Sequence, residues 1–74
     1  MTLAETKKGR KYQVNSVPEG IMKSQSIRFG IGEGAKIECS QKIPGGPIIV
    51  KKNFQEIAIS RNLARKIAVE KGDL

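Results

Sequence analysis

Hydrophobic and polar residues alternate over several short stretches of this chain, a pattern typical of strands with one buried face. The first stretch covers residues 10–16 and ends at Pro18-Glu19-Gly20, where proline and glycine favour a turn. The second stretch, residues 35–42, places Ile37 and Cys39 on one face and charged or polar side chains on the other. Both stretches therefore predict half-buried β-strands.

The second half of the chain predicts a hairpin followed by a short helix. Residues 47–51 form one predicted strand, and residues 54–59 form the returning strand. Between them, Lys52-Asn53 favours a tight turn, because asparagine tolerates left-handed backbone angles. Ser60 can then cap a helix over residues 61–66, since its hydroxyl can accept a hydrogen bond from a free backbone N–H group.

Glycines and prolines separate the predicted elements. Residues 21–29 contain neither residue type and space Met22, Ser26 and Phe29 three or four apart, which fits one or two helical turns. Gly30 can end this helix in a left-handed conformation. The residues assigned to turns are Gly30, Gly34, Gly45, Gly46 and Pro47.

Together these elements predict one mainly β domain over residues 1–74, a small SH3-like barrel of about five strands with one or two short helices. Residues 68–70 supply its last short strand. The ordered core is expected over residues 6–70, because residues 1–9 have the composition of a polar lead-in. The second face of the later strands carries apolar side chains that the helices must cover or leave exposed: Ile49, Phe54 and Ala58.

Charge and cysteine content narrow the choice of partners and compartment. Fourteen Lys and Arg residues against seven Asp and Glu residues give a formal charge of +7, which favours anionic partners such as nucleic acid, an acidic protein face or a membrane surface. The basic residues are spread along the chain, so a solvated surface and a dedicated anion site are both possible readings. Cys39 is the only cysteine, and the longest aliphatic run has three residues, so we expect a cytoplasmic protein without direct membrane insertion.

The residue types that carry catalysis are scarce, and we expect no enzyme. The chain has no histidine, and Cys39 is expected on the buried face of a strand, where a thiol is inert. No metal site and no cofactor are expected, because soft metals need several Cys and His ligands. The run Gly30-Ile31-Gly32-Glu33-Gly34-Ala35 matches a dinucleotide fingerprint in letters, but it follows a helix and precedes a strand, so a turn is favoured.

One group of residues, apolar except for Ser26, is a candidate docking surface for a protein partner. These residues lie on the predicted short helix and its exit loop, where a small domain can bury only part of them. The alternative is that all of them belong to the core. The group comprises Met22, Ser26, Ile27, Phe29 and Ile31, with Lys23, Arg28 and Lys36 around it.

Several motifs in fixed order resemble the FeoA family of ferrous iron transport proteins. Lys8-Gly9-Arg10-Lys11-Tyr12 precedes the first strand, and Ile27-Arg28-Phe29-Gly30-Ile31 ends the helix. Glu33-Gly34-Ala35-Lys36-Ile37, Pro44-Gly45-Gly46-Pro47-Ile48 and Ile57-Ala58-Ile59-Ser60-Arg61 follow. The resemblance extends over residues 6–70.

The resemblance implies an SH3-like fold and a cytoplasmic accessory protein without catalysis of its own. Its implied partner is FeoB, a membrane ferrous iron transporter with a cytoplasmic GTP-binding domain, which would recruit the chain to the inner face of the membrane and be regulated by it. No nucleic acid is expected as a partner. Oligomeric state and the direction of regulation stay open.

Two other functions remain as alternatives. A basic SH3-like module that binds RNA or the ribosome would use the +7 charge, although only Tyr12, Phe29 and Phe54 could stack on bases. Direct carriage of iron would require a ligand set that a chain with one cysteine and no histidine lacks.

Overall fold

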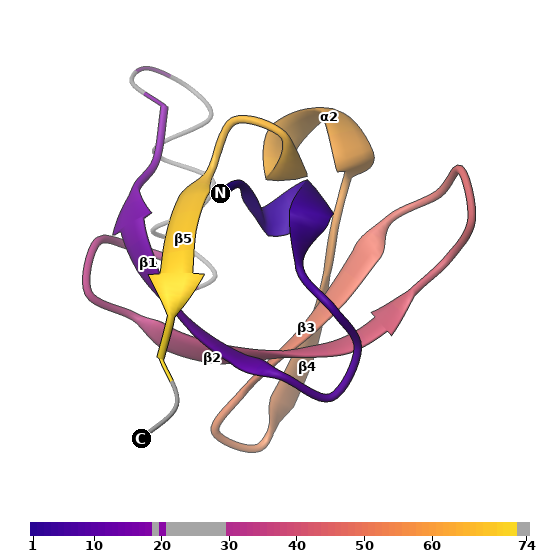
Figure 1. The fold of residues 1–74 in the computed structure, drawn as a ribbon, viewed down its shortest axis with the longest axis horizontal. Coiled ribbons are helices and arrows are strands. Elements are labelled where there is room, and N and C mark those ends of the chain that lie inside the picture. The colour runs from indigo at the N-terminus through magenta and orange to yellow at the C-terminus, as the bar shows by residue number, and fades with distance from the viewer. Residues whose placement is uncertain (19, 21–29, 73–74) are drawn as a thin grey trace.

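The computed structural model describes residues 1–18, 20 and 30–72, which form one curved antiparallel sheet with two short helical segments (Figure 1). The helix predicted over residues 21–29 lies outside the described residues. The described elements are the 3-10 helix η1 (Leu3–Glu5), β1 (Lys11–Ser16), β2 (Lys36–Lys42), β3 (Ile48–Lys52), β4 (Gln55–Ile59), α2 (Arg61–Ala64) and β5 (Ala68–Lys71). The prediction of a mainly β domain is confirmed.

The five strands are arranged in the order β4-β3-β2-β1-β5, with every neighbouring pair antiparallel. The sheet curls so that β4 and β5 lie at its two ends, and η1 and α2 lie beside one another over its concave side (Figure 1). The Leu3 N–H donates to the Ile67 carbonyl at 2.8 Å, and the Val69 N–H donates to the Met1 carbonyl at 2.8 Å. The N-terminal segment thus covers the β5 side of the barrel.

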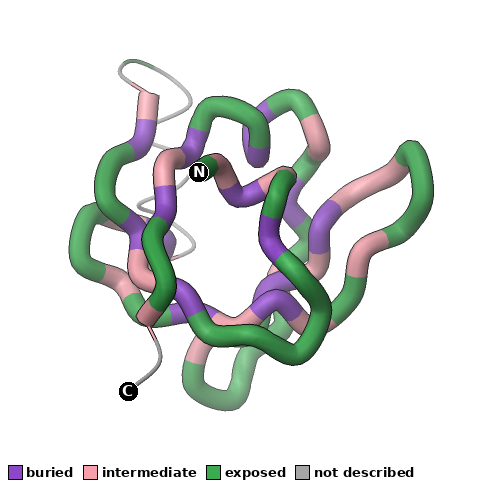
Figure 2. Tube along the Cα trace, in the orientation of Figure 1, coloured by how far each residue is buried: buried purple, intermediate pink, exposed green. Residues whose placement is uncertain are grey.

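Alternation along the strands places one set of side chains in a single core (Figure 2). In β1, Tyr12 and Val14 are buried while Lys11 and Asn15 are exposed. In β3, the alternate residues Ile48 and Val50 are buried in the same way. The core consists of Leu3, Tyr12, Val14, Val17, Ile31, Ile37, Cys39, Ile48, Val50, Ile59, Leu63, Ala64, Ile67 and Val69.

The expectation of a polar lead-in over residues 1–9 is wrong. Leu3 is fully buried, and Thr6 is buried with its hydroxyl donating to the Leu3 carbonyl at 2.7 Å. Thr2 forms a β-bridge with Ala68, so strand pairing holds this segment against β5. The core therefore begins at Leu3, because contacts with the far end of the chain supply the partners that local sequence does not.

The turns use residues that reach left-handed backbone angles. Gly30, Gly34 and Gly45 have φ values of 81°, 86° and 70°, a region that costs other residues energy. Asn53 has φ 56° at the first of the two residues between β3 and β4, as the sequence predicts. In the β2–β3 hairpin the Ile43 N–H donates to the Pro47 carbonyl and the Gly46 N–H to the Ile43 carbonyl.

The short helix α2 is fixed at both ends. The Leu63 N–H donates to the Ser60 hydroxyl at 3.2 Å, which confirms the predicted cap, but the α-helix ends at Ala64, earlier than predicted. The Arg61 guanidinium donates to the carbonyls of Gly46 and Ile43, each at 3.0 Å. Arg61 therefore connects α2 to the β2–β3 hairpin.

Candidate functional site

The predicted docking group can be examined only in part. Met22, Ser26, Ile27 and Phe29 lie outside the described residues. Ile31 is 0% exposed and belongs to the core, so its side chain offers no surface to a partner. Its alternative assignment as a core residue is the correct one, because the strands close around it.

Exposed apolar surface occurs instead at the tip of the β3–β4 hairpin. Phe54 is 101% exposed, which means that no part of the ring is covered by the described structure. On the outer side of the same hairpin, half-buried Ile49 pairs with exposed Ala58. We call Ile49, Lys51, Phe54 and Ala58 the hairpin surface. Within the described residues, Phe54 and Ala58 are thus left exposed and Ile49 is covered in part.

Gly30 packs against the β3–β4 hairpin on the face that carries Ile48 and Val50, opposite to the hairpin surface. A Cβ atom added to Gly30 would lie 3.0 Å from Lys52 Nζ and 3.6 Å from its Cδ and Cε atoms. Gly30 follows directly after Phe29 in sequence. Gly30 therefore lies against Lys52, the last residue of β3.

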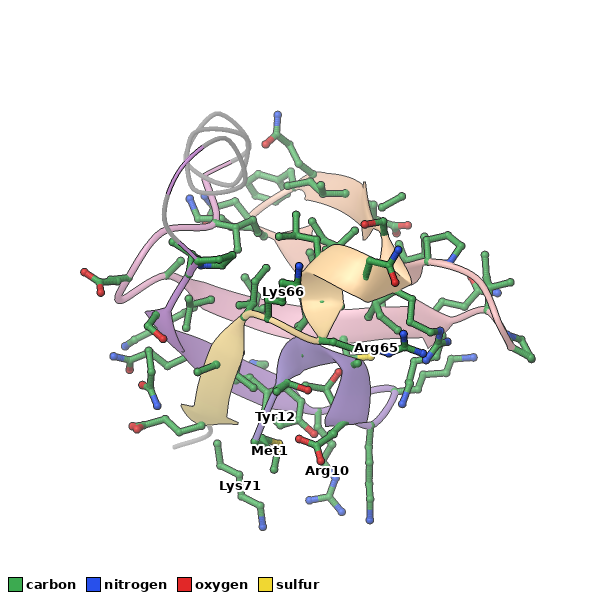
Figure 3. The ribbon with its side chains drawn as sticks, turned by 90° about the horizontal axis from the view of Figure 1, so that it is seen from above. Met1, Arg10, Tyr12, Arg65, Lys66 and Lys71 are labelled. Carbon is green, nitrogen blue, oxygen red and sulfur yellow. The ribbon has the colours of Figure 1, made fainter. Side chains whose placement is uncertain are left out.

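A second feature is a cavity of about 270 Å³ at the other end of the sheet, where β1 begins and β5 ends. Figure 3 shows Tyr12 and Met1 between Lys71 and Arg10, with the two cationic side chains extending outward. Arg65 and Lys66, from the end of α2 and the residues after it, are separate from this group in the same view. We call the cavity the basic pocket; it is lined by Met1, Glu5, Lys7, Arg10, Lys11, Tyr12 and Lys71.

Local hydrogen bonds hold the wall of the basic pocket. The Tyr12 hydroxyl accepts a hydrogen bond from the Lys7 N–H at 2.9 Å, and Tyr12 lies opposite Lys71 in the β1–β5 pairing. The loop before β1 is tied to β2, because the Gly9 N–H donates to the Cys39 carbonyl at 2.8 Å and the Cys39 N–H donates to the Arg10 carbonyl at 3.0 Å. These bonds bring residues from both ends of the chain to one site.

Among the residues that the structure describes, Glu5 is the one carboxylate in the lining of the basic pocket. Its Oε1 atom accepts a hydrogen bond from the Thr2 N–H at 2.6 Å. This backbone hydrogen bond, with a smaller contribution from nearby positive charge including Lys42, lowers the pKa of the Glu5 carboxyl. Glu5 is therefore ionised near neutral pH and already engaged with the start of η1.

The sequence reasoning did not find the basic pocket. Its first half was visible as the basic cluster of Lys7, Arg10 and Lys11, but Lys71 joins them only through the pairing of β1 with β5. Tyr12, one of the candidate base-stacking residues, is 4% exposed and cannot offer a ring face to nucleic acid. Of the candidate stacking residues in the described structure, Phe54 alone is exposed.

Cys39 is 0% exposed and unpaired, buried within β2 as the alternation predicts. Within residues 1–18, 20 and 30–72, no three His, Cys, Asp or Glu side chains gather in a way that could hold a metal ion. The same part of the chain contains no helix long and apolar enough to cross a membrane.

Comparison with known proteins gives a consistent family match. The model of the FeoA domain matches residues 1–71. The solution structure of iron(II) transport protein A from Clostridium thermocellum has 26% identity and a TM-score of 0.89, over 96% of this chain and 45% of that one. The solution structure of the FeoA protein from Chlorobium tepidum has 33% identity and a TM-score of 0.86, over 96% of this chain and 70% of that one. No curated protein sequence matches the chain.

A third structure identifies the fold. FeoA of Stenotrophomonas maltophilia, described as a prokaryotic SH3 domain protein and solved with zinc, has 24% identity and a TM-score of 0.81. The match covers 95% of this chain and 89% of that one. The predicted SH3-like barrel is therefore confirmed.

Proposed function

The chain belongs to the FeoA family, and from this premise we propose that it is a non-enzymatic accessory protein of ferrous iron uptake that binds and regulates a FeoB-type membrane transporter. A role in ferrous iron transport follows from the family itself. The observation that carries the proposal is the family match over residues 1–71, which takes in every described strand. Binding through the exterior suits a chain of 74 residues, which has little interior for a buried reaction site.

The hairpin surface supports the partner-binding part of the proposal. Aromatic side chains dominate the binding energy of many protein interfaces, and Phe54 is fully exposed at the tip of a hairpin. Lys51 of the hairpin lies opposite Glu38 and Glu56, so the positive charge available for association is the net charge of +7 of the whole chain. Such charges favour rapid association with an acidic face, such as one on the cytoplasmic domain of the transporter.

The residues of the predicted helix lie outside the described part of the chain and stay a second part of the proposal. These residues are Met22, Ser26, Ile27 and Phe29, which precede Gly30 in the sequence. We include these four residues with Phe54 in the proposed contact surface. Ile31 is excluded because its side chain is fully buried.

The test is a calorimetric titration of the purified chain with the cytoplasmic domain of a FeoB-type transporter from the same genome. Phe54→Ser is expected to weaken binding by about tenfold or more, as expected for the loss of an aromatic anchor. Ile43→Ser is the matched control, because Ile43 is a 40% exposed apolar residue on a different hairpin. The control variant should bind as the unmodified chain does.

The variants separate the choice of partner from the choice of surface. If the unmodified chain does not bind the transporter domain, the proposed partner is wrong. If it binds, and folded Phe54→Ser and Phe29→Ser variants bind equally well, the proposed surface is wrong. If the chain binds RNA and not the transporter domain, with an affinity that falls steeply as the salt concentration is raised, the nucleic-acid alternative is favoured.

A further inference from the structure

We propose that the basic pocket is a binding site for a small phosphate-bearing anion. The proposal concerns a different part of the molecule from the hairpin surface and does not depend on binding to a transporter. It rests on the charge of the lining, on the buried hydroxyl of Tyr12 and on the volume of the cavity.

The lining of the pocket has a strong excess of positive charge. Lys7, Arg10, Lys11 and Lys71 are all exposed at its wall, and Glu5 is the single carboxylate among the lining residues within the described ranges 1–18 and 30–72. Because the Glu5 carboxylate accepts the Thr2 N–H at 2.6 Å, one of its oxygens is committed to the backbone of η1. Four cationic residues around one concave site, against one engaged carboxylate among the described lining residues, give the site a positive potential.

Tyr12 adds a fixed polar group to this field. The residue is 4% exposed, so its ring is held by the core while its hydroxyl reaches the pocket lining. The hydroxyl accepts the Lys7 N–H at 2.9 Å. A phenol hydroxyl both accepts and donates, so its own proton stays available to a ligand oxygen. The pocket therefore combines one preorganised donor with mobile cationic donors.

The donor set and the volume favour phosphate over a simple carboxylate. A cavity of about 270 Å³ lies just below the range of roughly 300–1,000 Å³ typical of sites for drug-sized ligands, so it suits a small anion. Guanidinium groups bind phosphate through two parallel hydrogen bonds, and ammonium groups bind it as point charges. A phosphate monoester carries about −1.5 to −2 charges and three terminal oxygens, which can engage Arg10, Lys7 and Tyr12 together.

The test is a nuclear magnetic resonance titration of the full chain with inorganic phosphate at constant ionic strength. We expect saturable shifts of the backbone amide signals of Lys7, Arg10, Tyr12 and Lys71. Arg10→Gln and Lys71→Gln should each weaken binding at least fivefold. Lys66→Gln is the matched control, because it removes the same charge from an exposed residue outside the pocket lining.

Tyr12→Phe tests the fixed donor. It should weaken phosphate binding about threefold, with a thermal unfolding measurement to show that the barrel persists, since the Lys7 N–H loses its acceptor. Unchanged phosphate affinity in a folded Tyr12→Phe variant would contradict the role of the hydroxyl.

Other anions identify the source of the phosphate group. Tighter binding of pyrophosphate than of phosphate would indicate a polyphosphate or nucleotide chain, and equal affinity would indicate free phosphate; both support the site. The proposal is overturned if acetate binds as tightly as phosphate, because the pocket would then bind anions by their charge without selecting phosphate. It is also overturned if Lys66→Gln weakens binding as much as Arg10→Gln, or if the pocket signals do not saturate.

Discussion

The two edge strands of the sheet, β5 and β4, differ in whether another described segment pairs with them. At the β5 edge, Thr2 pairs with Ala68, the Val69 N–H donates to the Met1 carbonyl, and Leu3 is fully buried. At the β4 edge, no segment of the described structure pairs beyond the strand, and Phe54 is fully exposed at its beginning. In the described part of the chain, the first edge is covered by the N-terminal segment, and the second, which we call the open edge, has no pairing segment.

The two sheet edges of this small barrel therefore differ in what they contribute to the protein. Unpaired strand edges expose hydrogen-bonding groups that can recruit another chain, so covering one edge limits non-specific association. The closed edge contributes core residues and therefore stability. The open edge also contributes Ile59 to the core, whereas Gln55, Glu56 and Ala58 of the same strand are exposed.

Leu3→Ala gives the largest expected effect and tests the stabilising role of the closed edge. Truncating a fully buried leucine leaves a cavity and should lower the free energy of unfolding by about 2–5 kcal/mol. Phe54→Ala at the open edge should change it by no more than about 0.5 kcal/mol. Urea unfolding followed by circular dichroism measures both, and equal losses would remove the contrast between the edges.

Gly72→Ala is expected to have the next largest effect, at the end of the closed edge. A Cβ atom on Gly72 would lie 2.8 Å from the Tyr12 carbonyl carbon and 2.9 Å from the Gln13 nitrogen, both backbone atoms. The strands must separate to admit the methyl group, which should cost about 1–3 kcal/mol. Thermal unfolding of Gly72→Ala beside Lys71→Ala, whose side chain is exposed, checks this. Similar thermal unfolding midpoints for the two variants would show that the β1–β5 contact can admit the methyl group without loss of stability.

The stability losses caused by Glu38→Lys and Glu56→Lys compare a charge reversal in the interior of the sheet with one at the open edge. Glu38 lies opposite Lys11 on β1 and Lys51 on β3, whereas Glu56 of β4 lies opposite Lys51 alone. Like charges directly across strands are destabilising, so Glu38→Lys should cost about 1 kcal/mol and Glu56→Lys about half of that. Both losses should shrink in high salt. Denaturant titrations at two salt concentrations measure them, and a larger loss for Glu56→Lys would contradict the pairing.

Glu5 gives the smallest expected effect, a pH dependence at the closed edge. Its pKa is lowered from 4.5 in the folded chain, chiefly by the hydrogen bond from the Thr2 backbone. Its contribution to stability is therefore present above pH 4.5 and is lost as the pH falls through the lowered pKa. Glu5→Gln should flatten this part of the stability profile between acidic and neutral pH. An identical profile for Glu5→Gln would assign the acid sensitivity to other carboxylates.

The local part of the fold could be predicted from the sequence, because each strand carries its own alternation. The hairpin turn at Asn53 and the cap at Ser60 also depend on neighbouring residues only. The burial of Leu3 could not be predicted in this way. It depends on hydrogen bonding to Ile67 near the other end of the chain, and a three-residue helix has no periodicity to read.

The sites were harder to predict than the strands. Ile31 follows a predicted helix end, and the sequence allows it to lie either on the surface or in the core. The structure places it in the core of the closed barrel. The basic pocket requires Lys71 to lie beside Tyr12, which is a property of the β1–β5 register. Exposure of Phe54 was left open by the sequence, because it depends on where the helices pack.

The rate at which the buried thiol of Cys39 is alkylated can be used to follow opening of the fold. The side chain is 0% exposed on the central strand β2, where an alkylating reagent cannot reach it while the sheet is intact. Consumption of this one sulfur therefore reports how often the whole barrel opens. A bound partner or anion that slows the labelling stabilises the closed state, even when it binds far from the sulfur atom.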